Sequence, residues 1–311
     1  MDKVIVTPRS LSRGGHPLLE RITAAGYQLV FPSPGAQPTE EQLLAVIGDA
    51  VGYLAGVERV SAALLARATR LKVISRNGTG VDHIDLAAAE ARGIAVRRAE
   101  GANARGVAEL AFGHILAAAR GIAFADAELK AGRWTRQKGF ELEGRTLGLV
   151  GCGRIGKQVA RFALAFEMRV LAHDPYPDDT FAPSPAFAYA PLPEVLREAQ
   201  VLSLHCPPPA DGRALLDAPA LAGLRRGAVV VNTARQGLVD EAAMAAALRE
   251  GRVAAYTMDA FDREPPDDLG LVRTRGVLAT PHLGGFTDES VDRATAVAVD
   301  NLLASLRGNR A

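Results

Sequence analysis

The stretch that decides the fold is GLVGCGRIGKQVA, residues 148–160, in which glycines stand at positions 151, 153 and 156. It follows the apolar run TLGLV at 146–150 and continues into a segment with the apolar spacing of an amphipathic helix. Gly151 permits a tight turn, Gly153 lets the backbone approach a pyrophosphate, and Gly156 brings the helix against the strand. Such a Gly-x-Gly-x-x-Gly pattern between a strand and a helix predicts a dinucleotide-binding turn.

The residues around this turn predict how the dinucleotide is held. The backbone N–H groups of Arg154 and Ile155 are expected to face the phosphates at the positive end of the helix dipole. The next apolar run ends at Asp174, about 20 residues further along the chain, which is the separation expected for a ribose-binding acid. A carboxylate there accepts a hydrogen bond from the ribose 2′-hydroxyl and repels a 2′-phosphate, so the sequence predicts NAD rather than NADP.

The rest of the chain alternates short apolar runs with helical segments. Because the runs are almost continuous in Val, Ile and Leu, we expect strands buried on both faces, in parallel sheets covered by helices. The alternation starts a second time after about residue 131, so the predicted fold class is α/β with two doubly wound parallel-sheet domains. The expected strands lie at 4–7, 27–31, 51–56, 71–75, 94–98, 146–151, 169–174, 201–206, 228–233, 254–260 and 277–280.

Local signals mark several helices between these strands. Thr39 and Gln42 have the spacing of a capping box, Asp85 is placed to cap a helix, and Gly93 is placed to close it. The Ala-rich segment around 103–131 is interrupted by charged residues and a histidine, so we expect one long buried helix rather than a membrane span.

Composition bounds the class of protein. The chain of 311 residues has 48% hydrophobic and 23% charged residues, and its 36 Lys and Arg nearly balance its 35 Asp and Glu. Such a balance favours neither nucleic acid nor a membrane as a partner. Two cysteines and no apolar leader in the first ten residues predict a cytoplasmic protein without disulfides. No metal site is predicted, because His16, His83, His114 and His173 lack ligand spacing.

Polar residues follow three of the expected strands in the second half. Arg235 lies in NTARQGLVDE at 232–241, Asp259 and Glu264 lie in DAFDREPP at 259–266, and His282 lies in TPHLGG at 280–285. The carboxyl ends of parallel strands meet at one edge of a sheet, where ligands bind. Each residue alone is more typical of a solvated surface, but the set beside a dinucleotide-binding turn predicts an active site.

These motifs, with GRTLGLVGCGRIG at 144–156, closely resemble the D-isomer-specific 2-hydroxyacid dehydrogenase family over essentially the whole chain. The segments VTPRSLS at 6–12, LKVISRNGTGVDHIDL at 71–86 and GANARGVAEL at 101–110 are most similar to its phosphoglycerate dehydrogenase branch. The resemblance implies a Rossmann NAD-binding domain inserted into a flavodoxin-like substrate domain.

The resemblance also implies domain boundaries and assembly. The substrate domain is expected to comprise 1–98 and 286–311, and the NAD-binding domain 99–285. The helix near 103–120 is expected to carry the contact of a homodimer, although its Ala-rich face also suits a helix buried inside one domain.

Arg235, Glu264 and His282 are the catalytic residues that the resemblance implies, and their chemistry fits. Reduction of a 2-oxo acid needs a hydride for the carbonyl carbon and a proton for its oxygen. His282 is the natural proton donor, Glu264 raises its pKa, and Arg235 holds the substrate carboxylate through a planar fork. In the oxidative direction His282 acts as the base.

Other binding residues come from the resemblance alone. The backbone amides around Asn77 and Gly78 are expected to bind the substrate carboxylate, and Asp259 the nicotinamide carboxamide. Arg76, next to them, is a further expected substrate-binding residue. We expect Cys206 to be a packed small residue rather than a nucleophile, although its backbone touches the cofactor. The remaining predicted cofactor contacts are Pro207, Thr233, Ala234 and Gly284.

The substrate stays open at this point. One interpretation is 3-phosphoglycerate and 3-phosphohydroxypyruvate, with Arg9, Arg13, Arg76 or Arg105 binding the phosphate, and the alternative treats these arginines as surface charges. A reductase of glyoxylate, hydroxypyruvate or another 2-oxo acid is the second candidate, and a non-enzymatic NAD-sensing protein is the third. Departures from the family pattern at Gly106, Pro209 and Gln236 affect the expected shape of the pocket.

Overall fold

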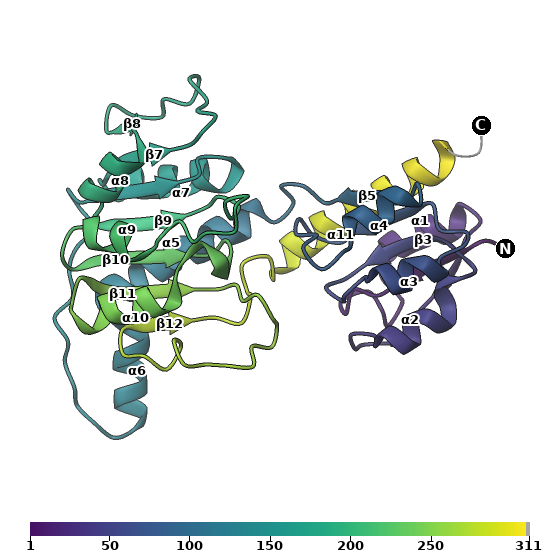
Figure 1. Ribbon diagram of the computed structural model, residues 1–311, viewed down its shortest axis with the longest axis horizontal. Coiled ribbons are helices and arrows are strands. Elements are labelled where there is room, and N and C mark those ends of the chain that lie inside the picture. The colour runs from purple at the N-terminus through teal and green to yellow at the C-terminus, as the bar shows by residue number, and fades with distance from the viewer. Residues whose placement is uncertain (309–311) are drawn as a thin grey trace. The chain divides into compact units, whose positions relative to one another are not determined.

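The computed structural model describes residues 1–308, and the chain forms two compact units (Figure 1). Unit 1 contains Met1–Asn103 and the C-terminal segment from Thr287, and unit 2 contains Ala104–Phe286. Each unit is built around one sheet in which every strand pair is parallel. The predicted α/β class with two doubly wound parallel sheets is therefore confirmed.

Unit 1 has a five-stranded sheet in the order β2-β1-β3-β4-β5. Helices α1 and α11 pack on one face of it, and α2, α3 and α4 pack on the other. The strands are β1 (Lys3–Val6), β2 (Gln28–Val30), β3 (Ala50–Ala55), β4 (Val73–Arg76) and β5 (Ala95–Arg98). The helices are α1 (Pro17–Ala24), α2 (Glu40–Ile47), α3 (Ala62–Arg67), α4 (Leu86–Ala91) and α11 (Asp288–Gly308).

Unit 2 has a seven-stranded sheet in the order β12-β11-β10-β9-β6-β7-β8. Helices α5 and α7 cover one face, and α8, α9 and α10 cover the other. The strands are β6 (Thr146–Val150), β7 (Arg169–His173), β8 (Phe187–Tyr189), β9 (Val201–Leu204), β10 (Ala228–Asn232), β11 (Val253–Met258) and β12 (Val277–Ala279). The helices are α5 (Ala104–Arg120), α6 (Ile122–Lys130), α7 (Arg154–Ala165), α8 (Leu192–Glu198), α9 (Ala218–Gly223), α10 (Glu241–Arg249) and the 3-10 turn Gln236–Leu238.

Alternation of side chains explains why the strands carry continuous apolar runs. In β10, Val229 and Val231 point into the core under α5 and α7, whereas Val230 points into the core under α8, α9 and α10. All three are at most 1% exposed. Successive side chains of a strand point to opposite faces, so a strand buried on both sides needs an apolar residue at nearly every position.

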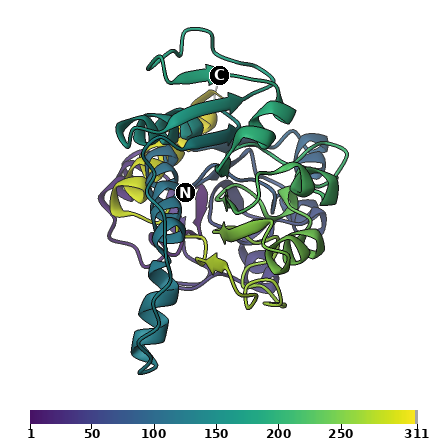
Figure 2. The ribbon, with the colours of Figure 1, turned by 90° about the vertical axis from the view of Figure 1, so that its left-hand side faces the viewer.

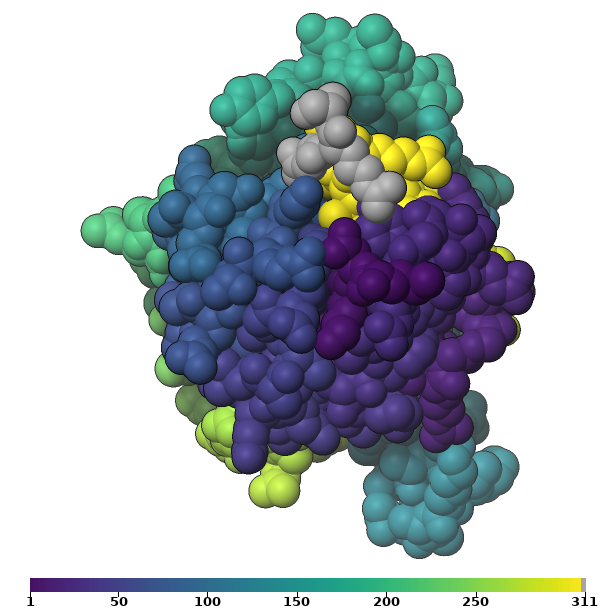
Figure 3. All heavy atoms as spheres, turned by 90° about the vertical axis from the view of Figure 1, so that its right-hand side faces the viewer, coloured from purple at the N-terminus to yellow at the C-terminus, as the bar shows by residue number. Residues whose placement is uncertain are grey.

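The two ends of the chain complete unit 1 together. Figure 3 shows the first residues, in dark purple, beside the yellow C-terminal helix α11. Ser75 of β4 donates a hydrogen bond to the carbonyl of Ala298 at 2.7 Å, and Arg21 of α1 pairs with Asp300 at 2.5 Å. The C-terminal segment therefore belongs to the core that the N-terminal strands begin.

The local helix signals are confirmed. Thr39 and Gln42 form the reciprocal hydrogen bonds of a capping box, and Asp85 accepts from the N–H of Ala88 at the start of α4. Gly93 closes that helix with a φ of +68°.

The expectation of one long buried helix over 103–131 is wrong. The helix ends at Arg120, Gly121 adopts a φ of +61°, and α6 leaves at an angle of 63° to α5. Nine residues of α5 are buried, but α6 buries none. Figures 1 and 2 both show α6 standing away from the rest of unit 2. The left-handed glycine breaks the helix, since Gly tolerates this backbone without steric cost.

Within residues 1–308 no single helix is long and apolar enough to cross a membrane. Only the bent pair of α5 and α6 together reaches that length and composition.

Candidate active site

The glycine turn after β6 has the geometry that its sequence predicts. Gly151 adopts a φ of +92°, and a Cβ on it would lie 2.5 Å from the carbonyl oxygen of His205. A Cβ on Gly156 would lie 2.2 Å from the carbonyl oxygen of Gly151. Real Cβ atoms do not approach backbone oxygens so closely, so neither position accepts a side chain without movement of the turn.

Gly153 serves a different purpose from its two neighbours. It caps the N-terminus of α7, and a Cβ on it would meet no atom within 4 Å. Open space therefore lies in front of the helix, where the first-turn N–H groups lack acceptors inside the helix. A pyrophosphate fits this cradle, because its negative charge is favoured at a helix N-terminus.

Asp174 is held beside the same turn. Its Oδ2 accepts from the N–H of Cys152 at 2.8 Å, and its Oδ1 accepts from the N–H of Tyr176 at 2.9 Å. These bonds fix the carboxylate at the carboxyl end of β7, where a ribose of the dinucleotide is expected. Burial raises the pKa of the Cys152 thiol, so Cys152 is a packed residue rather than a nucleophile.

Two buried polar atoms on the neighbouring strands have no hydrogen-bond partner within residues 1–308. Thr233, just after β10, is 8% exposed, and its Oγ1 has no hydrogen-bond partner among the described residues. His205, just after β9, likewise leaves Nδ1 without a partner in the described part of the chain. Buried polar atoms normally find partners, so a ligand bound at this edge of the sheet is one way to satisfy both atoms. The predicted contacts Cys206, Pro207 and Ala234 lie in the same two loops.

The structure brings the predicted catalytic histidine and carboxylate together. His282 follows β12, Glu264 follows β11, and Nδ1 of His282 lies 2.6 Å from Oε1 of Glu264. Both side chains are partly exposed, His282 by 52% and Glu264 by 37%. Arg235 follows β10, and its guanidinium donates to the carbonyl of Ala234 at 2.8 Å. The positive charge of Arg235 lowers the pKa of both Glu264 and His282.

The electrostatic interaction between His282 and Glu264 favours the protonated form of His282, as a proton donor requires. The hydrogen bond that His282 donates to Glu264 raises the pKa of His282, and the charges of Glu264 and Asp259 add to this effect. Desolvation and the charge of Arg235 oppose it without cancelling it. For Glu264, desolvation raises the pKa, but the hydrogen bond and charge of His282 outweigh it, so the pKa is lowered overall. The pair therefore stabilises the charged forms of both groups, an imidazolium beside a carboxylate.

The backbone of His282 is itself unusual, with a φ of +53°. A side chain in this left-handed region costs energy and persists only where the surroundings impose it. Asp259, 2% exposed, imposes it by accepting from the hydroxyl of Thr280 at 2.6 Å and from the N–H groups of Leu283 and Gly284 at 2.7 and 2.8 Å. Asp259 thus holds both sides of the loop that carries His282, and its contact with nicotinamide stays a prediction.

Two residues of this region were missed in the sequence. His114, buried in α5, brings Nε2 within 3.1 Å of the Thr280 hydroxyl, a contact across 166 positions that no local pattern reveals. Gln236 accepts from the N–H of Asp262 at 2.7 Å and donates to Glu241, which ties the loop of Glu264 to the start of α10. The departure from the family pattern at Gln236 was the signal that could have identified it.

The predicted substrate residues Arg76, Asn77 and Gly78 lie in unit 1, after β4. Arg76 donates to the carbonyls of Asn77 and Gly80, the latter at 3.1 Å, so its guanidinium shapes this loop. The N–H groups of Asn77 and Gly78 donate to backbone carbonyls at 2.9 Å each. Those of Thr79 and Gly80 donate no hydrogen bond within residues 1–308. The substrate role of the backbone around Asn77 and Gly78 stays a prediction.

Comparison with known proteins shows which family the chain belongs to. The family model described as D-isomer specific 2-hydroxyacid dehydrogenase, NAD binding domain, matches residues 112–284. The D-3-phosphoglycerate dehydrogenase of Methanocaldococcus jannaschii is 40% identical over 88% of this chain and 53% of the relative. The hydroxypyruvate reductase of Thermotoga maritima is 38% identical over 86% of this chain and 88% of the relative.

Solved structures of similar proteins have the same fold over nearly the whole chain. The TT0316 protein from Thermus thermophilus is 36% identical, with a TM-score of 0.86 over 99% of this chain and 97% of that one. D-Lactate dehydrogenase from Escherichia coli is 26% identical, with a TM-score of 0.80 over 99% and 98%. The chain spans about half the length of the curated phosphoglycerate dehydrogenases that it matches. The glycine turn, the acid after β7 and the match over residues 112–284 together show that the chain belongs to the D-isomer-specific 2-hydroxyacid dehydrogenase family and carries its NAD-binding domain.

Proposed function

We propose that the protein is an NAD-dependent oxidoreductase that interconverts a D-2-hydroxy acid and its 2-oxo acid. The observation that carries this proposal is the 2.6 Å contact between His282 and Glu264, on a loop held in a strained backbone beside the dinucleotide-binding edge. In this assignment unit 2 binds NAD, and unit 1 supplies the substrate-binding loop after β4.

The residues of the chain divide the reaction among them. NADH, when bound, supplies the hydride for the carbonyl carbon. His282 donates its Nε2 proton to the carbonyl oxygen, and Glu264, bonded to Nδ1, holds the ring in place and stabilises its positive charge. Arg235 binds the substrate carboxylate and draws electron density from the carbonyl. In the opposite direction the neutral ring of His282 takes the proton from the hydroxyl group.

Unit 1 contributes to binding of the substrate carboxylate. We assign this contact to the N–H groups of Thr79 and Gly80, which lack other acceptors among the described residues, rather than to those of Asn77 and Gly78. Arg76 acts by fixing the loop, since its guanidinium is bonded to two loop carbonyls.

We also propose a cytoplasmic homodimer. Cys152 and Cys206 are free thiols, which suits a reducing compartment. The helix expected to form the dimer contact, α5, buries nine of its residues within unit 2, whereas α6 buries none. We therefore assign the dimer contact to the exposed surface of α6.

The direct test is loss of NADH absorbance with 3-phosphohydroxypyruvate, hydroxypyruvate, glyoxylate, pyruvate and phenylpyruvate. We expect turnover of at least one acid, with NADH preferred over NADPH because Asp174 repels a 2′-phosphate. His282→Ala should lower turnover by at least about 100-fold while NADH still binds. His16→Ala, which changes a histidine of unit 1 outside every motif, is the control variant and should stay near the wild-type rate.

Two outcomes would contradict the proposal. Near-normal turnover in His282→Ala would remove the proton-transfer mechanism. No turnover of any acid, with NADH binding intact, would favour a protein that senses NAD without catalysis.

A further inference from the structure

A chain of hydrogen bonds within unit 2 connects helix α5 to the loop that carries His282. His114 of α5 is 3% exposed, and its Nε2 lies 3.1 Å from the hydroxyl of Thr280. Thr280 in turn donates to Oδ1 of Asp259 at 2.6 Å. The carboxylate of Asp259 also accepts from the N–H groups of the two residues that follow His282. A buried histidine is therefore linked, through two side chains, to the backbone beside the proposed proton donor.

The direction of each hydrogen bond in this chain follows from the protons available. The hydroxyl of Thr280 has one proton, which it donates to Asp259, because a carboxylate only accepts. The contact with His114 therefore needs a proton on Nε2. Burial lowers the pKa of His114, so its ring is mostly neutral at pH 7 and has one proton to place. Nδ1, which has no hydrogen-bond partner within residues 1–308, is then the nitrogen without a proton.

Helix α5 packs against the same loop at a second place. A Cβ on Gly284 would lie 3.1 Å from both the side chain of Val107 and Oδ2 of Asp259. Val107 and His114 are seven residues apart in α5, close to two helical turns, so they lie on one face of the helix. The loop is therefore held against α5 by close packing at Gly284 and by hydrogen bonding at Thr280.

Burial of an imidazole ring in α5 costs free energy that an apolar residue would avoid. Nδ1 of His114 gives up its hydrogen bond with water and gains none from residues 1–308. A leucine would fill a similar volume without burying a polar atom. What the histidine adds is the donor on Nε2 that reaches Thr280. The loop of His282 needs such support, because a left-handed backbone with a φ of +53° persists only where its surroundings impose it.

We propose that His114 is a positioning residue for the proposed reaction, which acts through Thr280 and Asp259 to hold the ring of His282 against Glu264. Its Nε2 proton fixes the hydroxyl of Thr280, and this hydroxyl fixes the carboxylate that holds the loop. The inference rests on the proposed function, since the position of His282 matters for proton transfer. The ionisation of His282 nevertheless reports on that position without any substrate.

The test measures the pKa of His282 by NMR, without substrate or cofactor, in protein labelled with 13C at histidine Cε1. The resonance of His282 is the one that is lost in His282→Ala. In His114→Leu we expect this pKa to fall by at least about half a pH unit, because the ring moves away from Glu264 and Asp259, which raise it. In His114→Gln the amide donates from nearly the place of Nε2, so the pKa should stay within about 0.2 units of the wild type.

Two further variants separate positioning from loss of packing. Ile115→Val removes a methyl group from a fully buried side chain of the same helix, so it should lower the melting temperature but leave the pKa of His282 unchanged. Thr280→Val removes the hydroxyl and should lower that pKa. Addition of His114→Leu to Thr280→Val should then give no further fall, since the chain is already broken at Thr280. If His114→Leu does not fold, His114→Met takes its place as the apolar variant.

Kinetics give a second readout where a 2-oxo acid is turned over. His114→Leu should lower kcat for reduction by at least about tenfold and change KM for the acid little, because displacement of the proton donor acts in the transition state. His114→Gln should restore most of this loss. Ile115→Val should keep the kcat of the wild type.

An unchanged pKa of His282 in the apolar variant would overturn the inference and leave the proposed function intact, whatever the melting temperature. An equal fall in His114→Gln would also count against it, because the donor on Nε2 would then not be what holds the loop. A further fall in the double variant, or an unchanged kcat in His114→Leu, would reject it as well. If the wild type turns over no acid, the proposed function fails, and the NMR titration still decides whether His114 positions His282.

Discussion

At the scale of single residues, the ionisation of His282, the proposed proton donor, depends on charges from three separate loops. Glu264 is bonded to His282, Asp259 lies behind the loop, and Arg235 opposes both from the end of β10. The balance raises the pKa of His282 above its ordinary value of 6.5. Reduction of a 2-oxo acid needs the protonated ring, so it stays fast below this pKa and slows as the pH rises through it. Oxidation needs the neutral ring and slows as the pH falls through the same value.

Glu264→Gln tests this account through the pH profile. Removal of the carboxylate removes the largest cause of the raised pKa, so the falling limb of kcat/KM for reduction should move to lower pH, and turnover at neutral pH should fall about tenfold or more. Profiles between pH 5 and 9 would measure the shift. Glu143→Gln, exposed and distant in sequence, should keep the wild-type limb. An unchanged limb in Glu264→Gln would show that the pair does not set the ionisation of His282.

At the scale of elements, two glycines of the turn between β6 and α7 have different expected roles. Gly156 allows the helix to pack on the strand, and Gly153 leaves room for the cofactor. Gly156 lies against the carbonyl of Gly151, whereas Gly153 faces open space. Gly156→Ala should lower the melting temperature by several degrees, because a Cβ at 2.2 Å forces helix and strand apart. Gly153→Ala should melt like the wild type yet bind NADH at least about tenfold more weakly, since the new methyl group occupies the approach to the pyrophosphate.

Thermal melting and NADH fluorescence titration of the two variants measure both quantities. Each variant serves as the control of the other, since both add one methyl group to the same turn. If Gly153→Ala bound NADH normally, the cofactor would not approach this glycine, and the assignment of the turn would be wrong.

The elements also show which parts of the fold can be predicted from the sequence. The strands with apolar residues on both faces and the helix caps could be predicted, because each depends on neighbours in the chain. The break at Gly121 could not, since an isolated glycine is tolerated within a helical pattern and only its positive φ reveals the end of α5. Strand β8 was also missed, because three residues at the edge of a sheet give too short a pattern.

The same limit holds for the site. Arg235, Glu264 and His282 stand in motifs that could be identified from the sequence. The hydrogen bonds of Thr280 with Asp259 and His114 join residues 21 and 166 positions apart, so their geometry appears only in the folded protein.

At the scale of the whole molecule, α6 packs little against the described part of its own chain: Arg275 lies over the ring of Phe124, but no residue of the helix is buried. Helices of this length are marginal in water and draw their stability from tertiary contacts, yet α6 buries no residue among those described.

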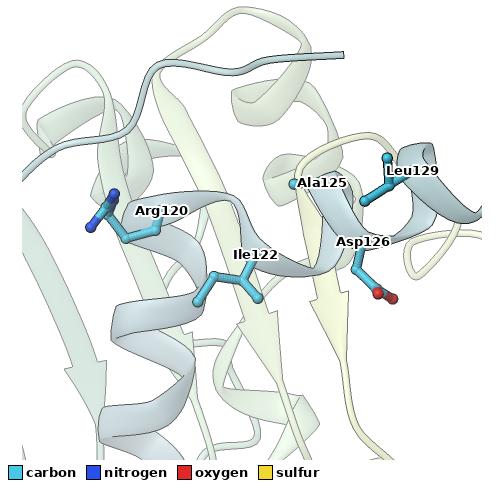
Figure 4. A pocket seen from close by; sticks show the side chains of 5 residues that line it. All are labelled: Arg120, Ile122, Ala125, Asp126 and Leu129. Atoms are coloured by element: carbon cyan, nitrogen blue, oxygen red, sulfur yellow. The ribbon is translucent and has the colours of Figure 1, made fainter. Parts of the chain in front are cut away.

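The surface hollow beside α6 is lined by Arg120, Ile122, Ala125, Asp126 and Leu129 (Figure 4). It combines apolar side chains with one cation and one anion. In the proposed homodimer a two-fold axis places the same surface on both sides of the interface, so each copy offers the other matching apolar groups and opposite charges.

This argument predicts that charge on α6 abolishes the proposed homodimer. Ile122 and Leu129 are 55% and 60% exposed, and replacement of both by glutamate brings buried, unpaired charges into the interface. We expect the double variant to sediment as a monomer, whereas the wild type sediments as a dimer. Leu44→Glu, at a position 43% exposed on α2 of unit 1, should leave the dimer intact. A dimeric double variant would place the interface elsewhere, and a monomeric wild type would remove the proposed assembly altogether.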